Sequence, residues 1–523
     1  MKTKLLCLFL LASVFCEAQT IEVFGLQSGI WAADTIRVTG DVKVKDSLRI
    51  QAGTTVLFDN YYSIKVENGA SLTAMGTESD SILFTVADTT GFHVFNAGDG
   101  GWDGIRMNRA GFCKLDYCRF QYGKAALDND QDGGALRIIK SNDVEIGHST
   151  LFCNFSREHG GALNAEWSNV IIHDCNVSNN LTYTGIDTVY YMYGGGMRFI
   201  NCKVDITGTA FRFNNGTSAI GGALSIDSYS INIDRCRFDH NYGINGAGLY
   251  LIRCYDNPCS ITNSLFANNT SGHFGGGLAI SDSSPLVANL TVVNNHSIGV
   301  NCGGVFFYQY SSPVLWNCII YGNTNYAPLD EPVQMWSWTY DGYAPMFHNC
   351  LVQYGFENIS NHEIINVYEN CLDEDPLFVD SENENFHLTA FSPCVDAGYT
   401  LETDMGYDLD GNWRICGDHI DIGAYEYSAT GVSETTQNKQ LIHVAGNPVT
   451  ASSYAEIECE NVCDLAAKVY SIEGKLLTNK NLGKTQIGLN HIEIGDLFQI
   501  LTSGTYLLVI RTPEKTFVTK IIK

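Results

Sequence analysis

The stretch GGALSIDSYSINIDRCRFDHN, residues 221–241, decides the fold. It opens on a glycine pair, alternates apolar and polar residues, turns, and closes on a second alternating segment and an asparagine. Alternation with a period of two predicts strands rather than helices. A unit of this length without a helical segment cannot bury its own apolar face, so several copies must stack.

The same glycine turn recurs through the middle of the chain at intervals of 25 to 34 residues. Each copy opens a unit of two or three short strand segments, so one coil per repeat predicts a parallel β-helix. The copies are GGAL at 133, GGAL at 160, GGGM at 194, GGAL at 221, GAGL at 246, GGGL at 275 and GGVF at 303.

An asparagine follows the second strand segment of these units. An amide at one turn position can donate to and accept from its copies one coil above and one coil below. The repeat therefore predicts a buried structural ladder. Its members are Asn180, Asn214, Asn241, Asn269, Asn295 and Asn323, and Phe155 stands in place of an earlier member.

The 18 cysteines fall into a repeated column and a few close pairs. Cys behaves as a small core residue, so the column predicts stacked buried thiols, and no CxxC pair exists to favour a zinc site. The column is Cys118, Cys175, Cys236, Cys318 and Cys350. The disulfide candidates are Cys254 with Cys259, Cys459 with Cys463, and Cys394 with Cys416.

The glycine turns and the FxxN segments, such as Phe211 to Asn214 and Phe238 to Asn241, carry a family resemblance over residues 100–330. They resemble the repeats of chlamydial polymorphic outer-membrane proteins and related right-handed β-helix proteins. The resemblance implies an all-β fold, a right-handed parallel β-helix, and a role like that of adhesins and other surface proteins.

The flanking segments suggest the remaining organisation. Residues 19–100 alternate strand patterns with glycine turns and are expected to form an N-terminal cap and the first coils, ahead of β-helix repeats over 101–349. The motifs DEDPLFVD, SPCVDAG and GDHIDIGAYEY resemble the closing coils of secreted β-helix proteins with a choice-of-anchor segment, here 350–427. Residues 428–440 are polar and predict a linker.

Residues 441–523 contain short strand patterns, which predict a small C-terminal β-sandwich. NPV at 447–449, VYSIEGK at 469–475, LTSGTYLLVI at 501–510 and the terminal KIIK resemble the sorting domain of type IX secretion cargo. That resemblance implies recognition by the type IX secretion machinery, passage through the outer membrane, and release or attachment at the cell surface.

Charge and the N-terminus restrict the compartment and the partners. A net charge of -26 disfavours nucleic acid and anionic membrane surfaces. Two lysines before the apolar run from Leu5 to Phe15 have the form of a secretory signal, with cleavage expected after Ala18 and a signal peptide over 1–18. No later stretch is long and apolar enough for a transmembrane segment. The chain is expected to be secreted or attached to the outer cell surface.

The strands after the glycine turns carry the charged candidates for chemistry. Alternation directs Arg137, Glu166, Arg198 and Asp227 outward, with the two carboxylates about 10 Å apart along the coils. The carboxylates suggest an inverting glycoside hydrolase, and the arginines suggest binding of acidic sugars or a lyase base. The alternative is a solvated ladder in which each arginine faces a carboxylate.

Aromatic residues are the second candidate for ligand contact. MWSWTYDGY, residues 335–343, places Trp336, Trp338 and Tyr340 on one side of a strand, where their rings either stack on sugars or close the end of the core. Alignment on GGVF directs Phe307 and Gln309 outward. The histidines share no repeat position, which favours separate surface or packing roles, and no Ser-His-Asp spacing, phosphate loop or HExxH motif occurs.

Two acidic segments suggest calcium. In LDNDQDGGAL, residues 127–136, Asp128, Asp130 and Asp132 precede a glycine turn, as in a Ca²⁺ loop, or form an acidic surface turn. In TDMGYDLDGNWR, residues 403–414, the position before DIGAYE favours a closing turn in which Asp caps backbone amides.

Three functions follow from these patterns. The first is a secreted or surface β-helix protein that binds a polysaccharide or cell-surface glycan in the manner of an adhesin. The second is a polysaccharide lyase or glycoside hydrolase on the exposed strand face. The third is a structural envelope component.

Overall fold

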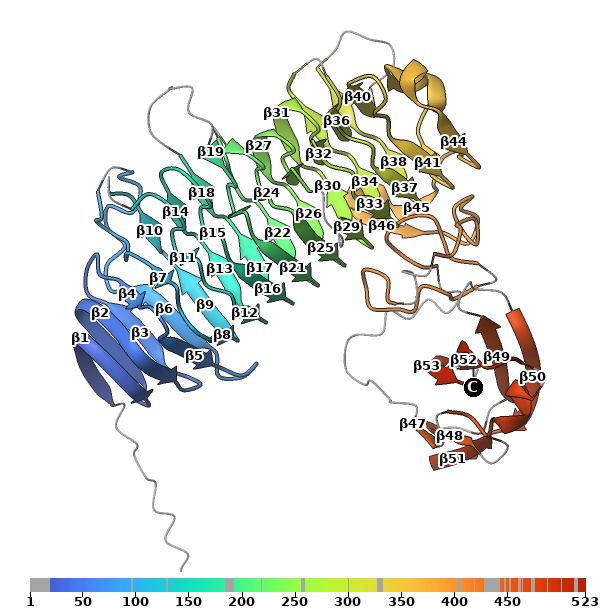
Figure 1. Cartoon of the computed structure of the whole chain (residues 1–523), viewed down its shortest axis with the longest axis horizontal. Coiled ribbons are helices and arrows are strands. Elements are labelled where there is room, and N and C mark those ends of the chain that lie inside the picture. The colour runs from blue at the N-terminus through green and yellow to red at the C-terminus, as the bar shows by residue number, and fades with distance from the viewer. Residues whose placement is uncertain are drawn as a thin grey trace, which may run out of the picture.

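The computed structural model describes a long β-solenoid, a closing segment and a C-terminal pair of small sheets (Figure 1). The described residues are 19–523 without 96, 128–129, 184–191, 218, 255–258, 300, 327–332, 402–405, 418, 428–442, 446–447, 451–452, 460–461, 463, 472–475, 487, 500 and 512–515. Within these residues the fold is all-β, with short 3-10 turns only and no helix long and apolar enough to cross a bilayer.

The solenoid begins with two long strands that wrap around its whole circumference. β1 (Thr20–Trp31) pairs in parallel with β2 (Thr35–Ile50) and bends at Gly25 and Gly29. β2 then pairs with one strand of each of the three sheets that follow.

Each later coil contributes one short strand to each of three parallel sheets, and strands of successive coils pair in register. The first sheet consists of β4 (Ile64–Val66), β7 (Ile105–Asn108), β11 (Leu136–Ile139), β15 (Leu163–Glu166), β20 (Met197–Ile200), β24 (Leu224–Asp227), β28 (Leu249–Ile252), β32 (Leu278–Ser281), β36 (Val305–Gln309), β40 (Met335–Thr339) and β43 (Ile359–Ser360). The second sheet consists of β5 (Ser71–Met75), β8 (Cys113–Asp116), β12 (Val144–Gly147), β16 (Asn169–His173), β21 (Lys203–Thr207), β25 (Ser230–Asp234), β29 (Cys259–Thr262), β33 (Leu286–Ala288), β37 (Val314–Trp316), β41 (Met346–His348) and β44 (Val367–Glu369). The third sheet consists of β3 (Thr55–Phe58), β6 (Ile82–Val86), β9 (Cys118–Gln121), β13 (Thr150–Phe152), β17 (Asn176–Ser178), β22 (Ala210–Arg212), β26 (Arg237–Asp239), β30 (Leu265–Ala267), β34 (Thr291–Val293), β38 (Ile319–Tyr321) and β42 (Leu351–Val352).

Further short strands lie where the chain turns from the third sheet of one coil to the first sheet of the next, and the last coil also contains 3-10 turns. The strands are β10 (Lys124–Ala125), β14 (Phe155–Ser156), β18 (Leu181–Thr182), β19 (Met192–Tyr193), β23 (Ala219–Ile220), β27 (Tyr242–Asn245), β31 (Thr270–Phe274), β35 (His296–Ser297) and β39 (Thr324–Asn325). The 3-10 turn η1 (Phe356–Asn358) takes the same place in the last coil, whereas η2 (His362–Ile364) lies between β43 of the first sheet and β44 of the second.

Alternation within each strand builds one continuous core. In β25, Ile231 and Ile233 are fully buried inside the solenoid. Phe211, Phe238 and Phe266 stack in successive coils of the third sheet, with ring centroids 4.8 and 4.6 Å apart. Each such side chain contributes about 1.5–3 kcal/mol on burial. The interior thus consists of columns of apolar side chains, as the repeat requires.

The buried asparagines form an unbroken ladder at the turn after the third sheet. Each side-chain Nδ2 donates to the Oδ1 of the next coil at 2.9–3.0 Å, from Asn180 through to Asn323. Asn154 extends the ladder by one coil toward the N-terminus, so Phe155 is not the equivalent position. Gln334 accepts the last bond at 3.1 Å and ends it.

The repeated cysteines line the corner before the third sheet. Cys118, Cys175, Cys236, Cys318 and Cys350 are buried free thiols, and burial raises the pKa of Cys175 and Cys236 to about 12.

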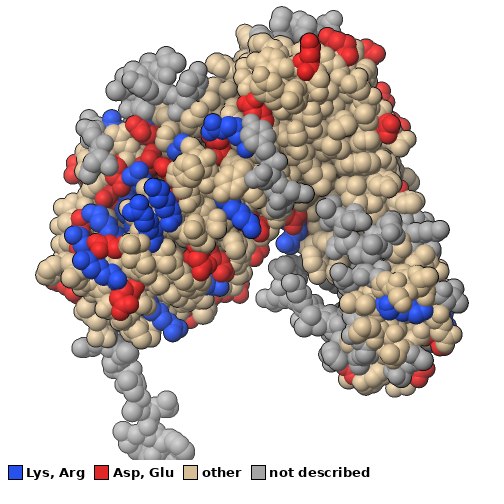
Figure 2. Space-filling view, in the orientation of Figure 1, with Lys and Arg blue, Asp and Glu red and all other residues tan. Residues whose placement is uncertain are grey.

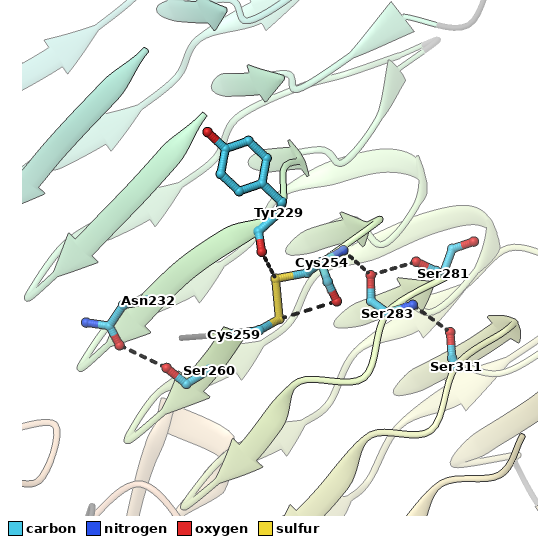
Figure 3. The surroundings of a disulfide bond; sticks show 8 residues. All are labelled: Tyr229, Asn232, Cys254, Cys259, Ser260, Ser281, Ser283 and Ser311. Atoms are coloured by element: carbon cyan, nitrogen blue, oxygen red, sulfur yellow. Dashed lines mark hydrogen bonds between the residues drawn. A yellow bond between two sulfur atoms is a disulfide. The ribbon is translucent and has the colours of Figure 1, made fainter. Parts of the chain in front are cut away.

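One disulfide forms within the described residues. It joins Cys254 to Cys259, whose Cα atoms are 6.2 Å apart, as the close spacing predicts (Figure 3). Beside it, the Cys254 N–H donates to Ser283 Oγ in the next coil at 2.9 Å. No disulfide joins Cys394 to Cys416, so that predicted pair is wrong. The pairing of Cys459 with Cys463 lies outside the described residues.

The closing segment packs back onto the outer face of the third sheet. It contains β45 (Phe378–Asp380), η3 (Ser381–Asn383) and β46 (Asn385–Leu388). Gly423 N–H donates to Asn317 O at 2.8 Å, and Ala424 N–H donates to Thr291 Oγ1 at 3.0 Å. Phe386, Ile422 and Tyr425 join the apolar outer residues of β30, β34, β38 and β42 in two small clusters. The last coils are therefore covered on one side.

The C-terminal residues form two antiparallel sheets around a common core. One sheet is β47 (His443–Ala445), β48 (Tyr454–Cys459) and β51 (Gly488–Glu493). The other is β50 (Leu476–Lys484), β49 (Asp464–Ser471), β52 (Thr505–Arg511) and β53 (Thr516–Ile522), and η5 (Gly495–Phe498) lies between β51 and β52. Buried residues of both sheets share one cluster, which gives a small β-sandwich.

Candidate functional site

The outer face of the first sheet changes character along the solenoid. Register places Arg106, Arg137, Asn164 and Arg198 in one column of the early coils. The same column continues through Ser225, Tyr250, Ala279, Phe306 and Trp336. The neighbouring column runs through Asn108, Ile139, Glu166, Ile200, Asp227, Ile252, Ser281, Tyr308 and Trp338. One continuous face thus carries a charged half and an aromatic half.

Arginines supply the positive charge for the acidic turn before β11. Asp130 Oδ2 lies 2.8 Å from Arg106 Nε, and its Oδ1 lies 3.0 Å from Arg137 Nη1. Arg137 Nη2 also lies 3.5 Å from Asp132 Oδ2, and Arg106 is buried and paired with Asp103 at 3.0 Å. Two guanidinium groups therefore neutralise Asp130 without a metal ion. Asp128 lies outside the described residues, and a calcium ion at this turn stays a prediction.

Asp132 and His159 are unusual among the ionisable groups of the charged half. Asp132 is buried, and within the described residues its Oδ1 has no hydrogen-bond partner. Burial raises the pKa of Asp132 to about 6, although Arg137 and Arg198 oppose the shift. Burial, Arg198 and Arg137 lower the pKa of His159 to about 3. His159 is therefore neutral at physiological pH, and its Nδ1 accepts from the Tyr193 N–H at 3.3 Å.

The two carboxylates considered for hydrolysis lie two coils apart, as the repeat predicts, and each is paired with a different arginine. Register separates Glu166 from Asp227 by two coils, about 10 Å between their backbones. Glu166 accepts from Asn164 Nδ2 at 3.0 Å and lies 4.0 Å from Arg198 Nη1. Both carboxylate oxygens of Asp227 pair with Arg253, with Arg253 Nε at 2.7 Å from Oδ1. The pattern is that of a charge ladder in which each carboxylate has its own cationic partner.

The aromatic half is built by β36 and β40. Trp336 and Trp338 both point outward, as the alternation predicts, and Trp338 is 52 % exposed. Tyr308 lies beside Trp338, with ring centroids 5.9 Å apart and an edge-to-face angle of 73°. Phe306 stacks on Tyr308 at 5.7 Å. Tyr340 follows the end of β40, and its ring instead contacts Tyr310 at 4.9 Å.

The expected register of β36 is wrong by one residue. Val305 pairs with Leu278, so Phe307 is fully buried in the core and Phe306 and Tyr308 face outward. Cys302 occupies the position of the first glycine of the other turns, and the glycine pair alone therefore misplaces the alignment.

The face in view in Figure 2 shows a similar division of charge. Lys, Arg, Asp and Glu gather over the N-terminal coils, whereas the C-terminal coils present mainly uncharged residues. The uncharged part of the solenoid is therefore broader than one strand pair.

Comparison with known proteins supports the fold of the repeat region. Residues 103–324 match the family model described as the right-handed beta helix region. No curated protein matches the chain. The family match and the strand register together identify residues 103–324 as a right-handed parallel β-helix.

Proposed function

We propose that this is an exported β-helix protein that binds a glycan on the outer face of its first sheet. The observation that carries the proposal is the group of Tyr308, Trp336 and Trp338 on one outer face of two adjacent coils, with the buried Phe306 packed against Tyr308 and Trp336. Pleated strands place such side chains about 4.8 Å apart between coils and about 7 Å apart along a strand. Rings with these spacings form a platform on which neighbouring sugar rings stack.

The charges of the molecule favour an uncharged polysaccharide over a polyanion. The net charge of -26 repels acidic chains at long range. The arginines of the charged half are already bound to carboxylates, so they offer hydrogen bonds to sugar hydroxyls rather than free positive charge. Asn164, between Arg137 and Arg198, adds an amide to this polar surface.

Affinity electrophoresis in gels that contain neutral polysaccharides tests the proposal, with a broad glycan array to find the ligand. Trp338→Ala should weaken binding at least tenfold, which corresponds to about 1.4 kcal/mol of lost stacking. Trp167→Ala is the matched control, because Trp167 is 56 % exposed and follows β15 in the charged half. Binding that is unchanged in Trp338→Ala and Trp336→Ala would refute the aromatic platform. No binding across the array would favour a structural envelope component.

A second candidate, cleavage of a glycan bound on the same face, is favoured by Asp132. A buried carboxyl whose pKa is about 6 and whose Oδ1 is unpartnered in the described structure has the properties of a general acid. Asp132→Asn should abolish any release of reducing ends or unsaturated sugars while leaving retention in the gel unchanged. A parent chain that cleaves none of the polysaccharides it binds would leave binding as the function.

Export and surface attachment belong to the same proposal. The signal-like residues 1–18 and the sorting motifs within 441–523 support passage through the type IX secretion machinery. Deletion of 441–523 in a host that has this machinery should leave the protein in the periplasm. Equal amounts of the truncated and full chains outside the cell would contradict this route.

A further inference from the structure

The corners between the second and third sheets bring His148 together with the consecutive residues His173 and Asp174 of the next coil. Register aligns Asp116, Gly147 and His173 at the ends of β8, β12 and β16. His148 and Asp174 follow Gly147 and His173 at the corner. Ligand atoms of His148, His173 and Asp174 all lie within 4.8 Å of one another.

Each imidazole presents one nitrogen to Asp174 and the other to a further carboxylate. Asp174 Oδ2 lies 3.2 Å from His173 Nδ1 and 3.7 Å from His148 Nε2. The second nitrogens lie 2.9 Å from Asp116 Oδ1 for His148 and 3.3 Å from Glu145 Oε1 for His173. A carboxylate on the outer ring nitrogen is the arrangement that orients metal-binding histidines and makes them better ligands.

Two glycines, Gly147 and Gly208, leave the space that the side chains of the cluster occupy. A Cβ on Gly147 would lie 2.6 Å from His173 Nε2 and 2.8 Å from Asp116 Oδ1. A Cβ on Gly208 would lie 2.5 Å from Asp174 Oδ1. The position of His173 therefore depends on a glycine in the adjacent coil.

Stacking fixes the other imidazole. The Tyr117 ring lies parallel to the His148 ring, with centroids 4.5 Å apart and planes at 4°. The two rings that face Asp174 are thus held before any ligand arrives, which reduces the entropy lost on binding.

The charges around the cluster favour a cation. Three carboxylates, Asp116, Glu145 and Asp174, face the two imidazoles, and the ammonium group of Lys114 lies 2.7 Å from Glu145 Oε1. The side chains of His148 and Asp174 are 37 % and 56 % exposed, so an ion can enter from solvent.

The cluster of Asp132, Glu158 and His159 provides the contrast. Its ligand atoms are equally close together, but Arg137 and Arg198 act on it electrostatically and disfavour a cation. Spacing alone therefore does not distinguish the two clusters, and the charge around them does.

We propose that His148, His173 and Asp174 bind one divalent transition-metal ion, with Zn²⁺ as the best match. Two imidazole nitrogens and one carboxylate oxygen are donors that zinc accepts, with water as the fourth ligand of a tetrahedron. Calcium and magnesium prefer sites made of oxygen atoms. The ion links two successive coils directly and a third through Asp116, so it stabilises the early solenoid.

Isothermal titration of the tag-free, metal-stripped full chain with ZnCl₂ tests this site, and the absorption spectrum of bound Co²⁺ reports tetrahedral nitrogen and oxygen ligands. His173→Ala should weaken Zn²⁺ binding at least a hundredfold. Asp116→Asn, which changes only the orienting carboxylate, should weaken it about 10–100-fold. CaCl₂ should produce no competing heat at this site.

Two histidine controls make the outcome decisive. His348 lies at the equivalent end of β41 with its Nδ1 3.3 Å from Glu369, so His348→Ala should bind Zn²⁺ as the parent does. His159→Ala removes one residue of the cluster of Asp132, Glu158 and His159, and it should also leave Zn²⁺ binding unchanged. Absence of saturable Zn²⁺ binding, or binding that survives His173→Ala and Asp174→Asn, would overturn the proposal. Asp174→Asn keeps the side-chain shape, so it decides the question if His173→Ala does not fold.

Discussion

Replacing Asn241 with alanine should cost the solenoid a large part of its local stability. Asn241 is 1 % exposed and makes four side-chain hydrogen bonds. Its Nδ2 donates to Phe211 O and Asn269 Oδ1, both at 2.9 Å. Its Oδ1 accepts from the Asn214 N–H and from Asn214 Nδ2, both at 3.0 Å.

The magnitude follows from the groups that would lose their partners. Asn214 Nδ2 still donates to Val177 O at 2.8 Å, and Asn269 Oδ1 still accepts from the Asn241 N–H at 3.0 Å. The Asn214 N–H is left buried and unpaired, and the Phe211 carbonyl loses one donor. The unpaired N–H costs about 1–3 kcal/mol and the bond lost at the carbonyl about 0.5–1.5 kcal/mol, so Asn241→Ala should lower the free energy of unfolding by about 1.5–4.5 kcal/mol.

Urea denaturation followed by far-ultraviolet circular dichroism measures this loss, and hydrogen exchange locates it in the coils on either side. Asn176→Ala is the matched control, because Asn176 is exposed at the start of β17 and should change stability by less than about 0.5 kcal/mol. If Asn241→Ala were as stable as Asn176→Ala, the ladder would not hold the coils together and the reasoning would be refuted.

Three further predictions concern the acidic groups and the closing segment. Burial raises the pKa of Asp132 from 3.8 to about 6, so the folded state binds this proton more tightly than the unfolded state does. The free energy of unfolding therefore falls as the pH rises through this window. Urea denaturation of Asp132→Asn should show no such decrease between about pH 4 and 6. Asp408 accepts from the N–H groups of Asp410, Asn412 and Glu426 at 3.0, 2.7 and 3.0 Å. Asp408→Ala should therefore destabilise the closing segment by about 2–4 kcal/mol. Asp408→Asn should retain most of this stability, and limited proteolysis compares the two variants. A Cβ on Gly423 would lie 2.7 Å from Ile319 Cδ1, and the φ of Gly423 is +109°. Gly423→Ala should therefore detach the closing segment from the third sheet and expose it to protease. Unchanged cleavage would count against this docking geometry.

Sequence periodicity predicts the features that repeat once per coil. The asparagine ladder can be predicted from the sequence because every member makes the same hydrogen bonds and is therefore the same residue type. The capping role of Asp408 is also predictable, because an Asp in a tight turn with glycines nearby accepts from local N–H groups such as that of Asn412.

Features that depend on the register between different residue types are not predictable in this way. Asp130 pairs with Arg106 from the preceding coil, whose turn, WDGIRM, lacks the glycine pair. His148 and His173 meet although they occupy adjacent rather than equivalent positions, because Gly147 lies opposite His173. A single substitution, Cys302 in a glycine turn, shifts the predicted orientation of Phe307. Contacts between coils can be predicted only when the register of each strand pair is known, and a repeat motif gives only the register that is typical of the pairs.

The asparagine ladder also sets how such a chain can change length during evolution. All of its amide-to-amide bonds run the same way, each side-chain Nδ2 of one coil donating to the amide oxygen of the coil that follows, from Asn154 to Gln334. Insertion or deletion of one complete coil leaves a donor facing an acceptor at the new junction, whereas a change of a few residues within a strand breaks the series. The closing segment is fastened to β30, β34 and β38. We therefore expect homologues to gain or lose whole coils ahead of β30 and to keep the length of those that follow.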